Sequence, residues 1–169
     1  RGLALPGPDD TSPPAAALGA FRLGYAPAAW DGLATYLQRQ GVSLAQAERV
    51  GLLVPRKDGS GHYDRFRHRL MFPVLDASGR VIAFSGRALP EPTPDELLAS
   101  GLRASKADEK PAKYINSPES PIYTKGEHLF GLHQARNDVR QKGEAVLVEG
   151  NFDVVALHAR GIQNVVAPL

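Results

Sequence analysis

Two carboxylates beside an apolar run are the residues in this chain best suited to chemistry. Glu149 directly follows the apolar residues 145–148, and Asp153 comes four residues later. If residues 145–148 form a strand of a parallel sheet, both carboxylates lie at its carboxyl end, where such sheets bind ligands. Mg²⁺ prefers oxygen ligands and is usually held by one or two carboxylates, with waters and substrate phosphates completing its shell. Glu149 is therefore a candidate metal ligand, and Asp153 a candidate auxiliary carboxylate.

Simpler structural roles for these two residues stay open at this point. Asp153 could cap the following helix or complement its dipole. Glu149 could be a strand-end residue with a basic partner. A Glu and an Asp at this spacing do not by themselves decide between a metal site and these roles.

A strand, a helix and a second strand would position the carboxylates. The unbroken apolar run at 145–148 predicts a strand buried on both faces. Asp153 opens a run in which Val154, Leu157 and Gly161 are spaced i, i+3 and i+7, which is typical of a helix that stops at a glycine. Residues 164–169 predict a second strand. We expect strands 146–148 and 164–167 to be parallel, with a right-handed crossover.

The upstream half predicts a mixed set of helices and strands. Residues 30–40 and 43–50 predict two helices, the first capped by Asp31 and stopped by Gly41, the second capped by Ser43. We do not interpret the pair as a DNA-reading helix-turn-helix, because the second helix has few basic or amide side chains. Residues 70–75 and 80–85 predict strands joined by a turn at 76–79, and residues 127–140 predict a helix.

Positive charge is concentrated in one stretch of an otherwise nearly neutral chain. The net charge is +2, yet residues 57–87 contain six Lys or Arg against three Asp. Arg65, Arg67 and Arg69 alternate, so a strand would place them on one face. That face could be an ordinary solvated surface or one that follows a phosphate backbone.

Several other classes of site find no support in the sequence. The 169 residues include no Cys, which excludes disulfides and a cysteine zinc site, and the five His lack metal-ligand spacing. No phosphate-binding Gly-x-x-x-x-Gly-Lys-Ser/Thr loop and no Gly-x-Ser-x-Gly motif is present. No apolar run approaches the about 20 residues of a membrane span, and no signal peptide is visible. We therefore expect a cytoplasmic protein without a membrane partner.

Five motifs resemble one protein family and occur in its order. Val-Glu-Gly-x-x-Asp-Val-Val at 148–155 resembles the opening of a Toprim domain, in the form found in bacterial DnaG-type primases. The other four resemble the RNA polymerase core of those primases. They lie at residues 21–31 (Phe-Arg-Leu-Gly-Tyr-Ala-Pro-Ala-Ala-Trp-Asp), 63–73, 79–87 and 113–119 (Lys-Tyr-Ile-Asn-Ser-Pro-Glu). The match runs from Phe21 to Leu169 with one insertion.

The resemblance implies an α/β fold in three parts. Residues 1–20 would be a flexible tail or linker. Residues 21–126 would form a mixed α+β N-terminal basic subdomain with an insertion at about 89–110. Residues 127–169 would be the incomplete start of the Toprim domain, a βαβ unit with parallel strands.

The resemblance also implies an activity and assigns residues to it. The family makes short RNA primers for DNA replication from ribonucleoside triphosphates on single-stranded DNA, by nucleotidyl transfer with Mg²⁺, or alternatively Mn²⁺. Glu149 would be the metal ligand and, with Asp153, a catalytic carboxylate. Seven residues would contact nucleic acid or nucleotide: Arg22, Arg65, Arg67, Arg87, Lys113, Tyr114 and Lys125.

The chain departs from the full family pattern in three respects. It ends at Leu169, before the paired-aspartate motif of the Toprim pattern, and it contains neither the zinc-binding module nor the region that binds the replicative helicase. We therefore expect this chain to bind no zinc, to bind single-stranded DNA weakly and to make no primer alone. Two alternatives stay open: another Toprim phosphoryl-transfer enzyme, or a non-catalytic single-stranded-DNA-binding fragment.

Overall fold

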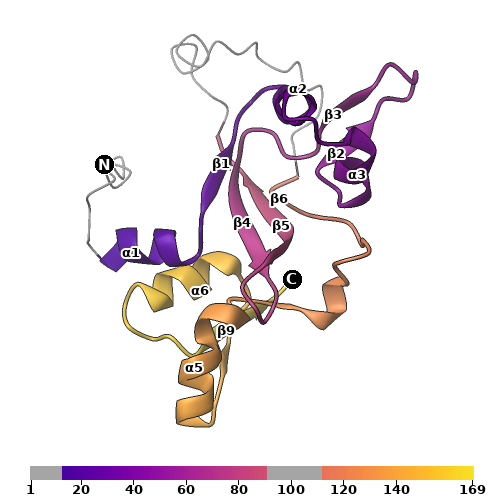
Figure 1. Ribbon diagram of the computed structural model, residues 1–169. Helices are drawn as coiled ribbons and strands as arrows, with labels where there is room; N and C mark the ends of the chain where they lie inside the picture. Colours follow the sequence, from indigo (N-terminus) through magenta and orange to yellow (C-terminus); the bar gives the residue numbers. More distant parts are fainter. Residues whose placement is uncertain (1–12, 91–111) are drawn as a thin grey trace. The chain divides into compact units, whose positions relative to one another are not determined.

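The chain forms helices and strands in two compact units (Figure 1). The computed structural model describes residues 13–90 and 112–169. One unit contains residues 24–72 and 82–125 and is called the basic unit below. The other contains residues 73–81, 126–169 and the described residues up to Leu23, and is called the carboxylate unit. The predicted α/β class is confirmed.

A four-stranded sheet forms the centre of the upstream half. Its order is β1 (Gly24–Ala26), β4 (Arg69–Leu75), β5 (Val81–Ala88) and β6 (Tyr114–Asn116). The predicted strands 70–75 and 80–85 are therefore confirmed as β4 and β5. The Asp76 carboxylate accepts hydrogen bonds from Ser78 and Arg80, which stabilise the turn between them.

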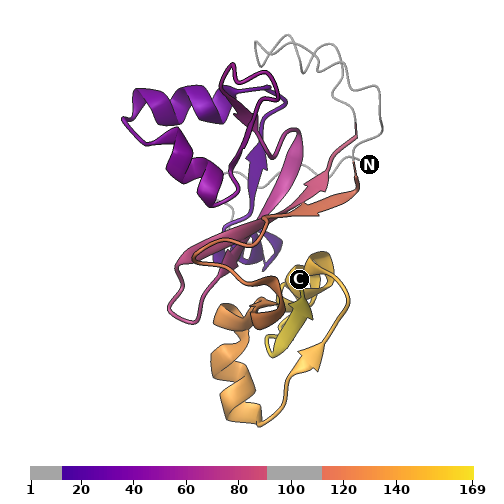
Figure 2. The ribbon, with the colours of Figure 1, turned by 90° about the vertical axis from the view of Figure 1, so that its right-hand side faces the viewer.

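A helix pair packs with a small hairpin in the basic unit (Figure 2). The helices are α2 (Gly32–Arg39) and α3 (Leu44–Arg49), and the antiparallel strands are β2 (Leu53–Pro55) and β3 (His62–Asp64). Both predicted helices are confirmed, and the Ser43 hydroxyl caps α3 by accepting from the Gln46 N–H at 3.4 Å. Apolar side chains of both helices and β2 form a shared core, with Ala34, Ala47 and Leu53 buried.

The predicted cap of α2 is wrong. Asp31 is at the N-cap position but its side chain makes no cap hydrogen bond. The carboxylate of Asp64, at the end of β3, takes that role instead, accepting from the Leu33 N–H at 2.7 Å and the Ala34 N–H at 3.0 Å. Asp31 instead lies 3.2 Å from the Arg56 guanidinium.

The predicted one-faced arginine strand is also wrong. β3 ends at Asp64 and β4 begins at Arg69, so Arg65 and Arg67 lie in an irregular segment, which includes His68 at a φ of 49°. Arg69 is buried and donates to the carbonyls of Gly86 and Ala112 at 3.0 and 2.9 Å. Arg69 therefore links β4 to β5 and is not accessible to a ligand. Arg65 and Arg67 are half-buried, so part of each side chain is accessible.

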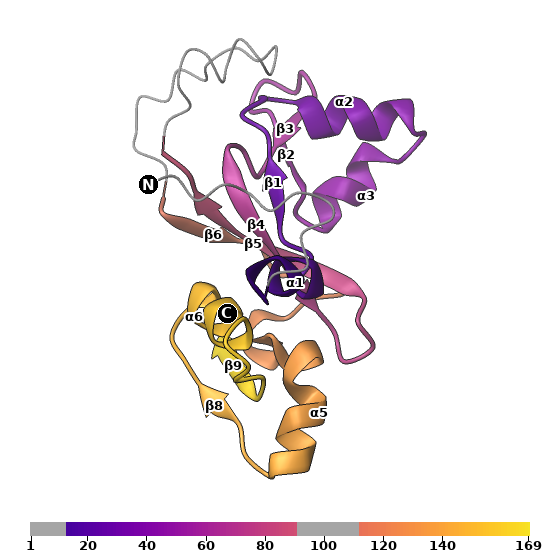
Figure 3. The same ribbon diagram turned by 90° about the vertical axis from the view of Figure 1, so that its left-hand side faces the viewer.

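The carboxylate unit contains a three-stranded sheet with two helices (Figure 3). Its order is β7 (Leu129–Phe130), β9 (Val165–Pro168) and β8 (Val146–Leu147), with α5 (Leu132–Lys142) and α6 (Asn151–His158) in the connections. The predicted parallel pairing is confirmed by the register of Val146 with Val165. Val154 and Val165 are fully buried between helix and sheet.

Two details of the carboxylate unit correct the sequence interpretation. β8 is not buried on both faces, since Leu147 is 66% exposed. The helix predicted at 127–140 begins only at Leu132, after the 3-10 turn η1 (Lys125–Glu127) and β7, because Gly131 adopts a φ of 84°. A Cβ at Gly131 would also meet Val154 at 2.8 Å, so glycine is required there.

The tail and the insertion are only partly described. Residues 13–20 of the predicted tail form a helix, α1 (Pro13–Ala20), so that part of the prediction is wrong. Residues 1–12, and nearly all of the insertion at 89–110, lie outside the described residues. Within the described ranges, every helix is too short or too polar to cross a lipid bilayer.

Candidate nucleic-acid interface and carboxylate site

A stacked aromatic pair lies against Arg67 in the basic unit. The rings of Trp30 and Tyr63 are nearly parallel, with their centroids 5.1 Å apart. The Arg67 guanidinium carbon lies 4.5 Å from the Trp30 centroid and 5.2 Å from that of Tyr63. These three similar distances describe a triangle, so Arg67 does not cover the Trp30 face opposite Tyr63. Trp30 remains 42% exposed, which leaves aromatic surface beside a cation.

Main-chain carbonyls hold the two neighbouring guanidinium groups. Arg67 donates to the Asp64 carbonyl, and Arg65 donates to the Asn116 carbonyl at 3.4 Å. The Arg65 Nε is buried and has no hydrogen-bond partner among the described residues. Burial lowers the pKa of Arg67, but an arginine stays protonated at neutral pH. Both residues therefore bring positive charge to this segment.

A second cation and aromatic group gathers where β5 pairs with β6. The register places Arg87 opposite Tyr114. The Arg87 guanidinium carbon lies 5.9 Å, and the Lys113 Nζ 6.0 Å, from the centroid of the Tyr114 ring. Tyr114 is 44% exposed. Three of the residues expected to contact nucleic acid thus lie in direct proximity.

The remaining two basic candidates belong to neither of these groups. Lys125 is exposed in η1, and its backbone N–H donates to the Glu119 carboxylate at 3.0 Å. Arg22 belongs to the carboxylate unit, where its guanidinium donates to the Gly79 carbonyl at 3.2 Å. Arg22 has a φ of 52°, an uncommon value for a residue with a side chain.

Glu149 and Asp153 line one hollow of about 530 Å³ in the carboxylate unit. Glu149 follows β8, and Asp153 lies in the first turn of α6, whose N-cap is Gly150. Both carboxylates are exposed, and a Cβ at Gly150 would lie 3.1 Å from the Asp153 Oδ2. Arg160 lines the same hollow. The turn after β8 and the C-terminal end of α6 thus contribute two acidic groups and one basic group to the same hollow.

The two carboxylates fit a magnesium ion that is held mainly by waters and substrate. Within the described ranges, no group of three or more His, Cys, Asp or Glu could hold a metal ion. Two hard oxygen donors on an open surface match the common protein environment of Mg²⁺, which keeps several waters and bridges to phosphates. Arg160 could neutralise the phosphate charge beside such an ion.

Sequence reasoning missed three residues at these sites. Trp30 and Tyr63 belong to the motifs at 21–31 and 63–73, but nothing in the spacing shows that they stack. Arg160 lies two residues beyond the end of α6, and nothing in the sequence pattern places it near Glu149. The other residues of these groups were candidates in the sequence analysis, and their roles stay predictions.

Comparisons with known proteins assign the chain to a family. The family model described as the DNA primase catalytic core, N-terminal domain, matches residues 14–136. A DNA primase of Synechocystis sp. is 44% identical over 150 residues, which cover 88% of this chain and 21% of that protein. The chain thus spans about a fifth of the length of this curated relative.

Solved structures agree with this assignment. The RNA polymerase domain of Mycobacterium tuberculosis primase DnaG, in complex with a double-stranded DNA oligomer with a 6-nucleotide overhang, matches with a TM-score of 0.74 and 35% identity, covering 91% of this chain and 43% of that one. A DnaG primase catalytic domain bound to single-stranded DNA matches with a TM-score of 0.70 and 38% identity, covering 91% and 42%. The chain therefore belongs to the family of the DNA primase catalytic core, N-terminal domain.

Proposed function

We propose that this chain is the part of a DNA primase that holds the template strand and contributes carboxylates to RNA primer synthesis. The observation that carries the proposal is the gathering of Arg and Lys side chains around exposed aromatic rings in the basic unit. Single-strand binding proteins combine these two features, because cations attract the phosphates and aromatic rings stack with bases. The DNA-bound relatives support the same assignment.

Each basic group has a distinct part in this proposal. Arg67 and Arg65 attract the backbone of a template whose base stacks on Trp30. Arg87 and Lys113 flank Tyr114 and contact template or nucleotide phosphates. Lys125 adds positive charge to the basic unit, and Arg22 adds it to the carboxylate unit.

The two carboxylates serve the nucleotidyl-transfer step. Glu149 would hold Mg²⁺, or Mn²⁺ in its place, and Asp153 would assist either directly or through a bound water. An ion held there would lower the charge cost of attack by a 3′-hydroxyl on the α-phosphate of a ribonucleoside triphosphate. Arg160, in the same hollow, offsets the negative charge of the triphosphate.

A matched pair of variants of the complete protein tests this function. Glu149→Gln keeps the size of the side chain and removes its charge. Glu144→Gln makes the same change at an exposed residue of the same unit that does not line the hollow. We expect Glu149→Gln to abolish template-dependent RNA synthesis while single-stranded DNA affinity stays within about twofold, and Glu144→Gln to change neither. Primer synthesis at the parental rate by Glu149→Gln would show that Glu149 has no metal-binding role.

A further inference from the structure

The basic unit contains an apolar cavity that the proposed polymerase function does not use. Its volume is about 680 Å³, within the usual range of small-molecule pockets. Helix α2, the segment after β1, and strands β4 and β5 contribute its walls. Its principal side chains are Tyr25, Leu33, Tyr36, Phe66, Met71 and Phe84.

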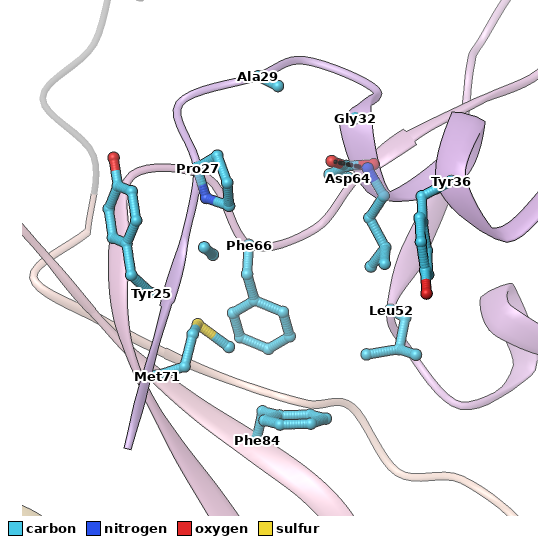
Figure 4. Close-up of a pocket in the computed structure, with 12 residues that line it drawn as sticks. Tyr25, Pro27, Ala29, Gly32, Tyr36, Leu52, Asp64, Phe66, Met71 and Phe84 are labelled. Carbon is cyan, nitrogen blue, oxygen red and sulfur yellow. Dashed lines mark hydrogen bonds between the residues drawn. The ribbon is translucent and has the colours of Figure 1, made fainter. Parts of the chain in front are cut away.

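Aromatic rings and a thioether dominate this lining. Figure 4 shows the Tyr25 and Tyr36 rings on opposite sides, with Phe66, Met71 and Phe84 gathered between them. The Tyr25 hydroxyl already bonds the His68 Nδ1, at 2.8 Å. Faces and edges of aromatic rings, with a polarisable sulfur, favour a flat aromatic ligand over an aliphatic chain.

The one acidic side chain of the lining decides the charge of the ligand. Both oxygens of Asp64 accept backbone N–H groups at the start of α2, from Leu33 and Ala34. Asp64 is only 5% exposed, and this burial raises its pKa. A second negative charge here would be repelled, so phosphates and nucleotides are unsuitable. A cation is not required either, because the helix N-terminus already compensates the carboxylate.

We infer that this cavity is a binding site for an uncharged, flat aromatic small molecule. Its lining shares no residue with the two cation groups or with the Glu149 hollow, and Arg67 meets it only through the main-chain carbonyl of Asp64. The inference therefore does not depend on the proposed polymerase roles.

The single methionine of the chain provides a direct reporter. Met71 lines the cavity, and in a sample with ¹³C-labelled methionine methyl groups its signal is assigned by its loss in Met71→Leu. We expect neutral N-phenyl-1-naphthylamine to shift this signal saturably, with a Kd of about 0.2 mM or tighter, as an aromatic ring moves against the methyl group. The anionic analogue 8-anilinonaphthalene-1-sulfonate and ATP should leave it unchanged.

Two matched variants locate the ligand. Leu33 and Leu37 are both half-buried on α2 and pack on the same core, but only Leu33 lines the cavity. Leu33→Trp should fill the cavity and weaken probe binding at least about tenfold, whereas Leu37→Trp should not. Folding of each variant is checked by circular dichroism, and Ala29→Trp, which keeps the Met71 reporter, is a second filling variant if Leu33→Trp fails to fold.

Each possible result either supports or contradicts the proposed binding site. A saturable Met71 shift by the neutral probe that is lost on filling supports the inference. The absence of a shift, equal binding to the filled variants, tighter binding of the anion, or tighter binding of the cationic 1-naphthylmethylammonium would each overturn it.

Discussion

The Arg67 guanidinium lies 4.5 Å from the centre of the Trp30 ring, and Tyr63 stacks on the same ring. Arg67 is therefore held in place before any ligand arrives, since its Nη1 is also bound by the Asp64 carbonyl. A prearranged cation beside an exposed ring can take up a phosphate and a base without ordering a long side chain first. This arrangement favours single-stranded nucleic acid, whose bases are free to stack.

Trp30 should stack with a template base. It is the single tryptophan of the chain, so the intrinsic tryptophan fluorescence reports on this site alone. We expect an oligo-dT strand to quench the fluorescence, and an abasic strand of equal length to bind through its phosphates without the same quenching. Trp30→Ala should weaken oligo-dT binding by about 1–3 kcal/mol.

An exposed tyrosine of the same unit serves as the control. Tyr36 is 59% exposed and belongs to neither cation group. Tyr36→Ala should leave oligo-dT affinity within about twofold. Equal quenching by the oligo-dT and abasic strands would refute stacking on Trp30 while leaving phosphate binding intact.

Asp64 should stabilise the basic unit far more than Asp31. Asp64→Ala removes the acceptor of two N–H groups at the start of α2 and should lower the free energy of unfolding by about 1–2 kcal/mol. Asp31→Ala breaks only an exposed ion pair with Arg56 and should cost less than about 0.5 kcal/mol. Urea unfolding of the two variants measures this, and equal costs would contradict the assignment of the cap to Asp64.

These two aspartates show what the sequence could and could not predict. The spacing of apolar residues predicted α2, α3, β4, β5 and the parallel pair β8 and β9, because periodicity depends on local burial. It assigned the cap to Asp31, the nearest acidic residue, because a partner 30 residues away leaves no local signal.

The site was predictable to a similar extent. The residue types and order pointed to Glu149, Asp153 and the basic side chains. The stacking of Trp30 with Tyr63 joins residues 33 positions apart, which leaves no local signal. The burial of Arg69 depends on the irregular segment between the end of β3 at Asp64 and the start of β4 at Arg69. A residue with positive φ there, His68, interrupts the alternation on which the arginine prediction relied.

His158 should make the stability of the carboxylate unit sensitive to mild acid. Its ring meets Phe21 edge-on at 4.9 Å, and burial lowers its pKa below the ordinary 6.5. As pH falls through about 6.5, the unfolded chain therefore takes up a proton that the folded chain resists, and stability decreases until the folded pKa is reached. Well above pH 6.5, where His158 is neutral in both the folded and the unfolded chain, it contributes no pH dependence.

The variant His158→Phe isolates this effect. Thermal unfolding, followed by circular dichroism at about pH 5, 6, 7 and 8, should show a smaller loss of Tm on acidification for His158→Phe than for the parent chain. Parallel pH profiles for the two proteins would contradict a buried, neutral His158.

The most direct test of the template surface is a salt titration of single-stranded DNA binding by the 169-residue chain. With about five phosphate contacts, log K against log salt should have a slope of about −3.5, or about a hundredfold loss between about 50 and 200 mM. The double variant Lys113→Ala and Lys125→Ala should reduce the slope by about 1.4, since each exposed lysine contributes about 0.7. Removing two other exposed charges of the same unit, with Arg39→Ala and Lys57→Ala, should leave the slope unchanged. Equal slopes for the two double variants, or binding independent of salt, would contradict the account.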